Sequence, residues 1–340
     1  YKRQENDNYV IQSRRLNVEN AKQSELLAGN RPNPSITLSQ GTYNITNPHN
    51  FGPPSSAITY NHTFEGWNKR DARINYAKAE TNRNQIDLSA NIKTIQLEAY
   101  MNYIDALRVK TQLELRRKAM SNLKKDRVAS ANLTKDLEIN EADYRFYLES
   151  IRSYFPEDKR ELLTPTGQFK IGTLPSVEKF INNDFANRND IKSLNAALES
   201  AQKNLALVSN NRRLDLTGSV TYAHTSGWQS TDGTDNPMQN SWTASLTVPL
   251  PFSWTNNADV QIASNTISQL ELAIKDAKAK AAAENRQAAL RYQAALRELT
   301  EKSRAISKKS PNLITNVKEL ENALLVTELE SSVLKNLAVL

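Results

Sequence analysis

The chain contains no cysteine and only 9 glycines among its 340 residues. Without cysteine there is no disulfide framework, no thiol nucleophile and no cysteine-based zinc site. Glycine this scarce argues against the α/β folds whose tight turns and phosphate loops depend on it. The motifs GxGxxG, GxxxxGK[ST] and GxSxG are absent, which argues against nucleotide binding and against hydrolase chemistry.

Histidine and long apolar runs are also scarce. The three histidines, His49, His62 and His224, lie far apart and none sits in an HExxH-like pattern, so we predict no catalytic residue, no metal site and no cofactor. No run approaches the ~18–20 apolar residues of a membrane-spanning helix. The net charge is +7, but basic residues alternate with acidic ones, without the clustered patch that a nucleic-acid partner requires.

Two long stretches contain no glycine and almost no proline, from about Asn68 to Phe155 and from about Thr255 to Leu340. The first carries apolar or small residues at alternating steps of four and three, the 3.5-residue repeat of a coiled-coil seam. These positions are Leu88, Ile92, Ile95, Ala99, Asn102, Ala106, Val109 and Leu113. A helix from Asn68 to a break near Asn132 would be roughly 96 Å long. This pattern predicts a rod or a tube.

Four segments show the two-residue period of β-strands instead. They are Ser35–Asn44, Ala57–Phe64, Leu214–Tyr222 and Trp242–Leu250. Long polar loops join the first to the second and the third to the fourth, which predicts two hairpins. One face of each strand is apolar and the other is mostly Thr, Ser and Asn. A transmembrane β-barrel alternates in this way, with apolar residues outward and small polar residues toward a water-filled lumen.

The same order of elements occurs twice along the chain. At an offset of about 180 residues, Ile11, Ala21 and Thr37 match Ile191, Ala201 and Thr217. We predict a first repeat over 1–180 and a second over 181–340. The first holds an N-terminal helix, a hairpin (35–64), a long helix (68–132), a returning helix (136–155) and a connecting segment (156–180). The second holds a helix (186–212), a hairpin (214–250), a long helix (255–327) and a truncated returning helix.

With the elements in this order, the sequence resembles the TolC-like outer membrane efflux family. Pro34–Leu38 (PSITL) is similar to the family's helix-to-strand transition, and Phe64–Ile74 (FEGWNKRDARI) to its strand-to-helix junction, Phe-Asp-Gly-Gly-x-x-Arg-x-x-Ile. Arg188–Ile191 (RNDI) resembles the Arg-Pro-Asp-Ile that opens the second repeat. Val248–Phe252 (VPLPF) resembles its Ile-Pro-Leu-Phe.

The resemblance implies a mainly α fold with some β: a homotrimeric duct in the outer membrane, most of whose mass lies in the periplasm. Each subunit would give four strands to a shared twelve-stranded barrel and its helices to an α-helical barrel. Four strands cannot close a barrel alone, and an open sheet edge does not occur in lipid. The implied partners are outer-membrane lipid, a periplasmic adaptor protein and, indirectly, an inner-membrane pump. The implied function is passive export of drugs or metal ions.

The sequence departs from the family pattern at several places. An anchoring cysteine and the C-terminal equatorial segment are absent, so we expect the natural chain to extend at both ends. Both helix turns lack the family's glycine, and Asn132 and Thr327 stand at the expected positions. Pro311 interrupts the second long helix, and a similar proline occurs in the cation-efflux branch, which points to metal-ion export.

The resemblance also implies functional positions near the helix tips. Acidic rings that narrow the periplasmic entrance would use Glu328 and Glu330, with Asp136 and Glu138 at the first tip. Each of these acids could equally be a solvated helix-start residue that the helix dipole stabilises. Adaptor contact would use Arg127, Asn132 and Leu133, and these positions could equally serve ordinary helix contacts. Two aromatics just past the hairpins, Trp67 and Trp254, would lie at the membrane interface or pack in a small core.

A soluble coiled-coil scaffold with small β inserts is the alternative. The mean hydropathy of −0.63 suits a water-exposed rod. The strands discriminate between the two hypotheses, because a scaffold has no reason to keep charge off both faces of four strands.

Overall fold

The computed structural model forms two compact units. The helical unit comprises Tyr1–Glu19, Asn84–Asn195 and Glu271–Leu340, and the sheet unit comprises Asn20–Arg83 and Ala196–Leu270. The residues described are 8–41, 55–122, 127–157, 165–167, 175, 187–229, 233–250, 257–307 and 317–339.

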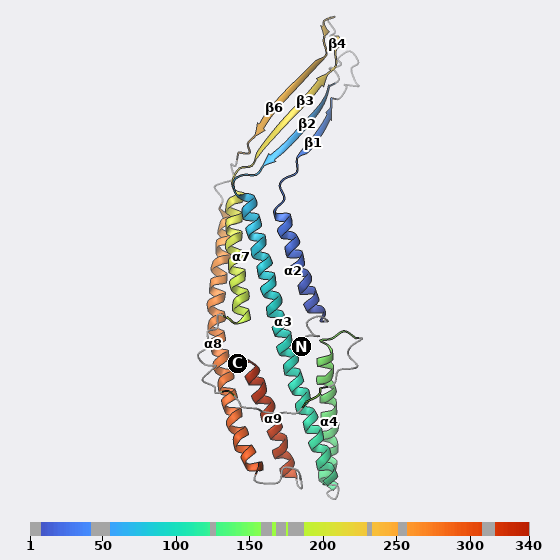
Figure 1. Cartoon of the computed structure of the whole chain (residues 1–340), viewed down its shortest axis with the longest axis vertical. Coiled ribbons are helices and arrows are strands. Elements are labelled where there is room, and N and C mark those ends of the chain that lie inside the picture. The colour runs from blue at the N-terminus through green and yellow to red at the C-terminus, as the bar shows by residue number, and fades with distance from the viewer. Residues whose placement is uncertain are drawn as a thin grey trace. The chain divides into compact units, whose positions relative to one another are not determined.

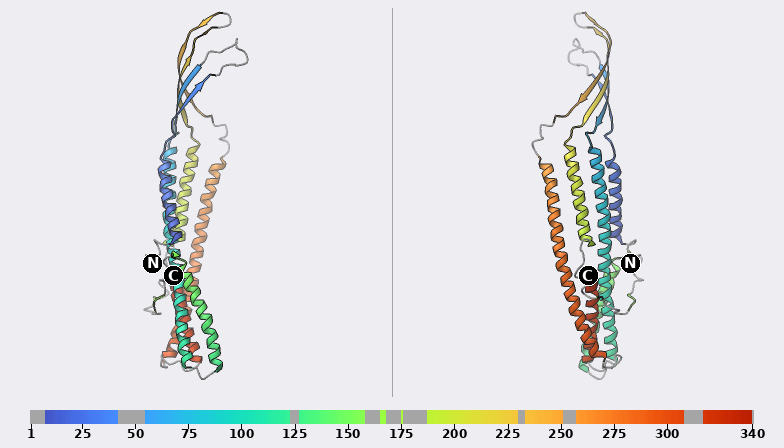
Figure 2. Two further views of the ribbon diagram at one scale, coloured as in Figure 1. Left: turned by 90° about the vertical axis from the view of Figure 1, so that its right-hand side faces the viewer. Right: turned by 60° about the vertical axis from the view of Figure 1, so that its left-hand side comes forward.

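The sheet unit is built on a four-stranded antiparallel sheet. Its strands are β1 (Ser35–Gln40), β2 (Ser55–Phe64), β3 (Leu216–Thr225) and β6 (Gln239–Thr247). They lie in the order β1-β2-β3-β6 (Figure 1). The central pair, β2 and β3, joins the two sequence repeats, with Ser55 opposite Thr225 and Phe64 opposite Leu216. The segments of α2 (Tyr9–Ala28), α3 (Lys69–Asn122), α7 (Asn189–Asn211) and α8 (Ala258–Ser307) that belong to this unit lie side by side next to the sheet (Figure 2).

All four predicted strands are present, with shifted ends. A further short pair was not predicted: β4 (Trp228–Gln229) and β5 (Asp235–Asn236) extend the second hairpin inside the segment expected to be a loop. Pairs of two residues carry too little periodicity to be recognised from sequence.

Six helices are described. They are α2 (Tyr9–Ala28), α3 (Lys69–Asn122), α4 (Arg127–Arg152), α7 (Asn189–Asn211), α8 (Ala258–Ser307) and α9 (Val317–Val339). Asn8 caps α2, because its Oδ1 accepts hydrogen bonds from the amides of Val10 and Ile11. In the described part of the chain, no helix combines the length and the apolar character needed to cross a membrane.

The first helix turn comes earlier than predicted. α3 ends at Asn122 and α4 begins at Arg127, so Asn132 lies inside a helix and the predicted span 68–132 is wrong. The intervening residues, Leu123–Asp126, contain no glycine, proline or asparagine to mark a break. Packing sets the register of α4 instead, because its Leu133 is buried in a cluster with Ala119 of α3 and Leu320 of α9.

The second turn also comes earlier than predicted. α8 ends at Ser307 and α9 begins at Val317, so Thr327 lies inside α9 and the predicted span 255–327 is wrong. Pro311 falls between the two helices, outside the described residues. A proline lacks the amide hydrogen and clashes with the preceding turn, so it favours the end of a helix over its interior.

Two apolar clusters form the core of the helical unit. The larger packs Tyr292, Ala295 and Leu299 of α8 against Leu329 and Val333 of α9. The smaller is the cluster of Ala119, Leu133 and Leu320. The predicted seam of α3 is confirmed, because none of its eight positions is exposed and four of them are buried, Ile95, Ala106, Val109 and Leu113.

Candidate membrane-facing sheet and helix-tip residues

One face of the four-stranded sheet is apolar and exposed. The strand register aligns its side chains in cross-strand rows. The two fullest rows are Leu38–Ile58–Tyr222–Trp242 and Ile36–Tyr60–Val220–Ala244. Trp242 is 74% exposed in the single subunit, and Ile36, Leu38 and Leu246 are exposed as well. A contiguous apolar surface of this kind needs a partner or a non-aqueous solvent.

The opposite face is a surface of hydroxyl groups. The register forms the rows Thr37–Thr59–Thr221–Thr243 and Ser35–Asn61–Ser219–Ser245. Oγ1 of Thr59 lies 2.9 Å from Oγ1 of Thr221, and Oγ of Ser219 lies 2.6 Å from Oγ of Ser245. None of the four strands contains Asp, Glu, Lys or Arg, so this face is polar without being charged.

A polar row bounds the apolar face at its loop end. It consists of Gln40, Ser56, His224 and Asn240, each opposite the next in the register. The His224 ring nitrogen Nδ1 lies 2.7 Å from the Asn240 amide oxygen. Immediately inside this row, the rings of Tyr222 and Trp242 pack with centroids 5.0 Å apart. Aromatic pairs at such a boundary are typical of a membrane interface, and the sequence analysis did not single out these two.

Ion pairs bound the apolar face at its helix end. Arg73 forms a bidentate pair with the carboxylate of Glu65, which raises the pKa of that arginine. Lys69 lies 2.8 Å from Asp215. Burial alone would raise the pKa of Asp215, but hydrogen bonds from the Gly66 amide and from Lys69 outweigh it, so the pKa lies below its ordinary value.

Trp67 lies directly beyond this boundary, in the turn between β2 and α3. Its side chain is 81% exposed, so in the single subunit it does not pack in a core. Trp254, the other aromatic predicted for the interface, lies outside the described residues.

The sheet has two open edges. Within the described residues, β1 pairs with β2 alone and β6 pairs with β3 alone. The outward backbone groups of both edge strands are therefore available for pairing with another chain.

The first pair of gate candidates lies within α4. Asp136 is exposed, and its carboxylate is 3.9 Å from Nε of Arg116 on α3. Arg116 was not predicted as a functional residue. Its Nε and Nη1 are buried without a hydrogen-bond partner among the described residues, so Asp136 is the charge that compensates it. Glu138 is exposed.

The second pair of gate candidates lies within α9. Glu328 is exposed, and its Oε1 accepts a hydrogen bond of 3.4 Å from the buried Gln112 of α3. Glu330 is partly buried, and this burial raises the pKa of its carboxyl group. Asp136 and Glu328 therefore contact two positions of α3, Arg116 and Gln112, that lie about one turn apart.

The adaptor-contact candidates have different environments. Arg127 is the first residue of α4, and its side chain lies outside the described part of the structure. Asn132 is exposed. Leu133 is only 4% exposed and holds α3, α4 and α9 together, so this position is unsuited to contact with a partner.

No group of three or more His, Asp or Glu residues that could hold a metal ion occurs within the described ranges.

Comparison with solved structures identifies the fold. The chain is similar to the outer-membrane channel OprN, with a TM-score of 0.73 and 11% identity over 99% of this chain and 87% of that one. It is similar to the CmeC outer membrane channel of Campylobacter jejuni, with a TM-score of 0.70 and 13% identity over 98% and 82%. It is also similar to the open state of the MtrE outer membrane channel of Neisseria gonorrhoeae, with a TM-score of 0.65 and 13% identity over 99% and 86%.

The fold is therefore that of the TolC-like outer membrane channels, as the sequence resemblance implied. No protein-family model matches the chain, and a search of curated proteins finds no match.

Proposed function

We propose that the protein is the outer-membrane exit duct of a tripartite efflux system, a homotrimer through which drugs or metal ions leave the cell passively. The observation that carries this proposal is the sheet, with one exposed apolar face, one uncharged hydroxyl face and two open edges. Its longer strands have 9 or 10 residues, the length that a tilted strand needs to cross the bilayer.

The open edges support a shared barrel. An unpaired strand edge cannot face hydrocarbon, because its backbone groups would have no partners there. Pairing of β6 of one subunit with β1 of the next satisfies both edges, and three subunits close a barrel of twelve strands. The apolar rows then face lipid and the hydroxyl rows line the lumen.

The uncharged lumen supports a wide, unselective outer section. Hydroxyl groups solvate cations and anions alike, so in this proposal the barrel does not choose the cargo. Selection by charge would lie with the acidic residues of α4 and α9, repeated three times around the axis. Glu328 is the strongest gate candidate, because it is exposed and its hydrogen-bond partner among the described residues, Gln112, is neutral.

The ends of α3 and α8 face the periplasmic adaptor in this proposal. Arg127 and Asn132 are the described positions that we retain for this contact, at the start of α4 and one to two turns into it. The adaptor in turn would connect the duct to an inner-membrane pump.

The soluble scaffold is the competing hypothesis. The exposed apolar rows disfavour it, because Leu38, Ile58, Tyr222 and Trp242 would form a contiguous apolar patch in water.

Single-channel recording in a planar lipid bilayer tests the proposal. We expect stable conductance from the folded trimer, with a preference for cations that decreases when Glu328 and Glu330 are both changed to Gln. The matched double variant, Asp136→Asn with Glu138→Gln, tests the other pair of acids. Folded protein that never inserts would overturn the duct and favour the scaffold. Insertion with unchanged ion preference in both double variants would overturn the acidic gate alone.

A further inference from the structure

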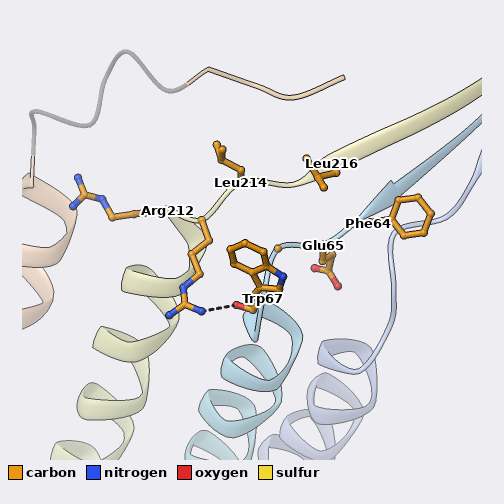
Figure 3. Close-up of a pocket in the computed structure, with 8 residues that line it drawn as sticks. Phe64, Glu65, Trp67, Arg212, Leu214 and Leu216 are labelled. Atoms are coloured by element: carbon orange, nitrogen blue, oxygen red, sulfur yellow. Dashed lines mark hydrogen bonds between the residues drawn. The ribbon is translucent and has the colours of Figure 1, made fainter. Parts of the chain in front are cut away.

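A pocket of ≈620 Å³ opens in the sheet unit where the first strand-to-helix junction meets the start of β3. Figure 3 shows its walls, which come from both sequence repeats. The first repeat contributes the end of β2 and the junction, residues 64–67, and the second contributes residues 212–216. Both parts lie within one unit, on the two central strands of the sheet.

The pocket wall continues the exposed apolar face. Phe64 and Leu216 are opposite each other in the register and form the last row of that face. Leu214 lies beyond them, and the indole ring of Trp67 extends beneath Leu214 (Figure 3). An acyl chain lying along the sheet would therefore pass into the pocket without leaving an apolar surface.

The backbone around Trp67 is specialised for this arrangement. A Cβ atom at Gly66 would lie 2.2 Å from the Leu214 carbonyl oxygen, so only glycine permits the close approach of the two chain segments. Asn68 adopts a left-handed backbone with φ of 62°, which asparagine tolerates better than most residues. These features hold a large aromatic side chain in an exposed position.

One positive charge at the pocket has no acidic partner among the residues that the structure describes. Glu65 is paired with Arg73, and Asp215 with Lys69. Arg212 interacts with Asn257 and Asp259. Among the described residues, Arg213 pairs with no carboxylate. Its Nη1 donates a 3.2 Å hydrogen bond to the Trp67 carbonyl, drawn as the dashed line in Figure 3.

The remaining N–H groups of the Arg213 guanidinium suit a phosphate oxygen, which accepts charge-assisted hydrogen bonds from such a fork. We propose that the pocket binds an anionic phospholipid of the adjoining bilayer leaflet, with its phosphate at Arg213 and an acyl chain along Leu214, Leu216 and Phe64. This inference rests on the proposed function, because it requires the apolar face to meet lipid.

The position of the pocket favours lipid over a second copy of the chain. Its walls come from the end of β2, the start of β3 and the segments adjoining them, whereas the edges open to a neighbouring subunit are β1 and β6. The excess of positive charge favours an anionic headgroup over a zwitterionic one, whose ammonium group would find no free carboxylate beside Arg213.

Native mass spectrometry of the purified trimer in neutral detergent tests the proposal. The probes are palmitoyl-oleoyl phosphatidylglycerol and palmitoyl-oleoyl phosphatidylcholine, which share their acyl chains and differ in charge. We expect up to three tightly retained phosphatidylglycerol molecules per trimer. Arg213→Gln should weaken phosphatidylglycerol binding about fivefold, since one basic side chain near a membrane surface is worth about that factor. Phosphatidylcholine binding should weaken less, because the ammonium group of that lipid already opposes the attraction of its phosphate to Arg213.

Two further variants separate the contribution of the apolar wall from that of the Arg213 charge. Trp67→Ala should weaken both lipids, because it removes apolar wall and no charge. Lys203→Gln is the matched control. Lys203 is exposed on α7, the helix that precedes Arg213, about 15 Å from that residue along the helix axis. Its substitution should leave the preference for phosphatidylglycerol intact. Trimer mass and helical circular dichroism verify that each variant is folded.

Three results with the two lipids would overturn the inference, and a competition experiment provides a fourth. The three are equal binding of the two lipids by the wild type, an Arg213→Gln variant that keeps the preference, and an equal loss in Lys203→Gln. Displacement of phosphatidylglycerol by millimolar inorganic phosphate would also do so, because it would show a simple anion site. If the same wild-type preparation conducts in a bilayer but shows no lipid preference, only this inference fails. If it does not insert, the proposed function fails first.

Discussion

The sheet and the helical unit differ in how their polar side chains are paired. The four strands contain no Asp, Glu, Lys or Arg, and hydroxyl groups satisfy one another across the strands. The helical unit is linked by ion pairs between helices, such as the exposed pair of Arg117 with Glu141 at 2.9 Å and the partly buried pair of Lys335 with Asp105 at 2.5 Å. The contrast indicates different surroundings, because exposed ion pairs belong in water and uncharged strands suit a boundary between lipid and a lumen.

Placing one charge on either face of the sheet is the strongest test of this contrast. Val220→Lys puts an ammonium group in the middle of the apolar face, beside Tyr60 and Ala244. At the bilayer midplane this costs ~2–4 kcal/mol in each subunit, and we expect insertion into the outer membrane to fail. The amount of inserted protein is measured in membrane fractions, from the change in gel migration that heating causes in a folded barrel.

The neighbouring substitution Thr221→Lys is the matched control. Its side chain faces the hydroxyl rows beside Thr59 and Thr243, so the variant should insert normally and shift ion preference toward anions. If both variants insert equally well, the assignment of the two faces is wrong.

In the helical unit, truncating a buried apolar side chain should cost more stability than truncating an exposed polar one. Leu133→Ala empties part of the cluster with Ala119 and Leu320, and we expect a loss of about 2–4 kcal/mol in the free energy of unfolding. Asn132→Ala, at the exposed neighbouring position, should change it by less than about 0.5 kcal/mol. Denaturant unfolding followed by circular dichroism compares the two, and equal effects would contradict the placement of α4.

The junction beside the sheet should be sensitive to a single methyl group. Gly66→Ala places Cβ 2.2 Å from the Leu214 carbonyl oxygen, and we expect a destabilisation of about 1–3 kcal/mol. Gly218→Ala meets only Phe64 at 3.5 Å and should be nearly neutral. The melting temperatures of the two variants give the comparison, and a neutral Gly66→Ala would show that the two segments are less closely packed than described.

The smallest expected effect concerns pH. The pKa of Asp215 is lowered in the folded state, so its stabilising contribution is present above the unfolded pKa of about 4 and is lost as pH falls through the lower folded value. Asp215→Asn leaves Lys69, which is 7% exposed, without its partner. Because Asp215 is itself partly exposed, we expect a cost of only about 1–2 kcal/mol.

Melting temperatures measured between pH 3 and pH 7 check this prediction. The difference between wild type and Asp215→Asn should be constant above about pH 5 and shrink below about pH 4. A difference that grows as the pH falls would contradict the lowered pKa.

The sequence predicted the sheet and the seam of α3 because both depend on simple periodicity. The alternation of Ile58, Tyr60 and Phe64 with Thr59 and Thr63 is visible without a structure. The sequence did not, however, predict where the long helices end. No residue of Leu123–Asp126 disfavours helix, and the end of α3 depends on the burial of Leu133 against two other helices, which is a tertiary effect.

Among the functional positions, too, some could be recognised from local sequence and others only from tertiary contacts. Trp67 was recognised from its place after a strand, whereas Arg116 and Arg213 look like any other basic residue on a polar helix surface. What distinguishes them is the set of neighbours that the fold brings to each: the Asp136 carboxylate for Arg116, and the Trp67 carbonyl for Arg213.

Cross-linking of the two sheet edges tests the shared barrel most directly, and the absence of native cysteine leaves the background clean. Thr37→Cys on β1 is combined in turn with Ser241→Cys, Thr243→Cys, Ser245→Cys and Thr247→Cys on β6, all on the hydroxyl face. We predict that the pair in register across subunits forms a covalent trimer on oxidation in membranes. Thr59→Cys with Thr243→Cys, in which β2 is an internal strand, should stay monomeric. Monomer from every edge pair, in protein shown to be folded and inserted, would contradict the account.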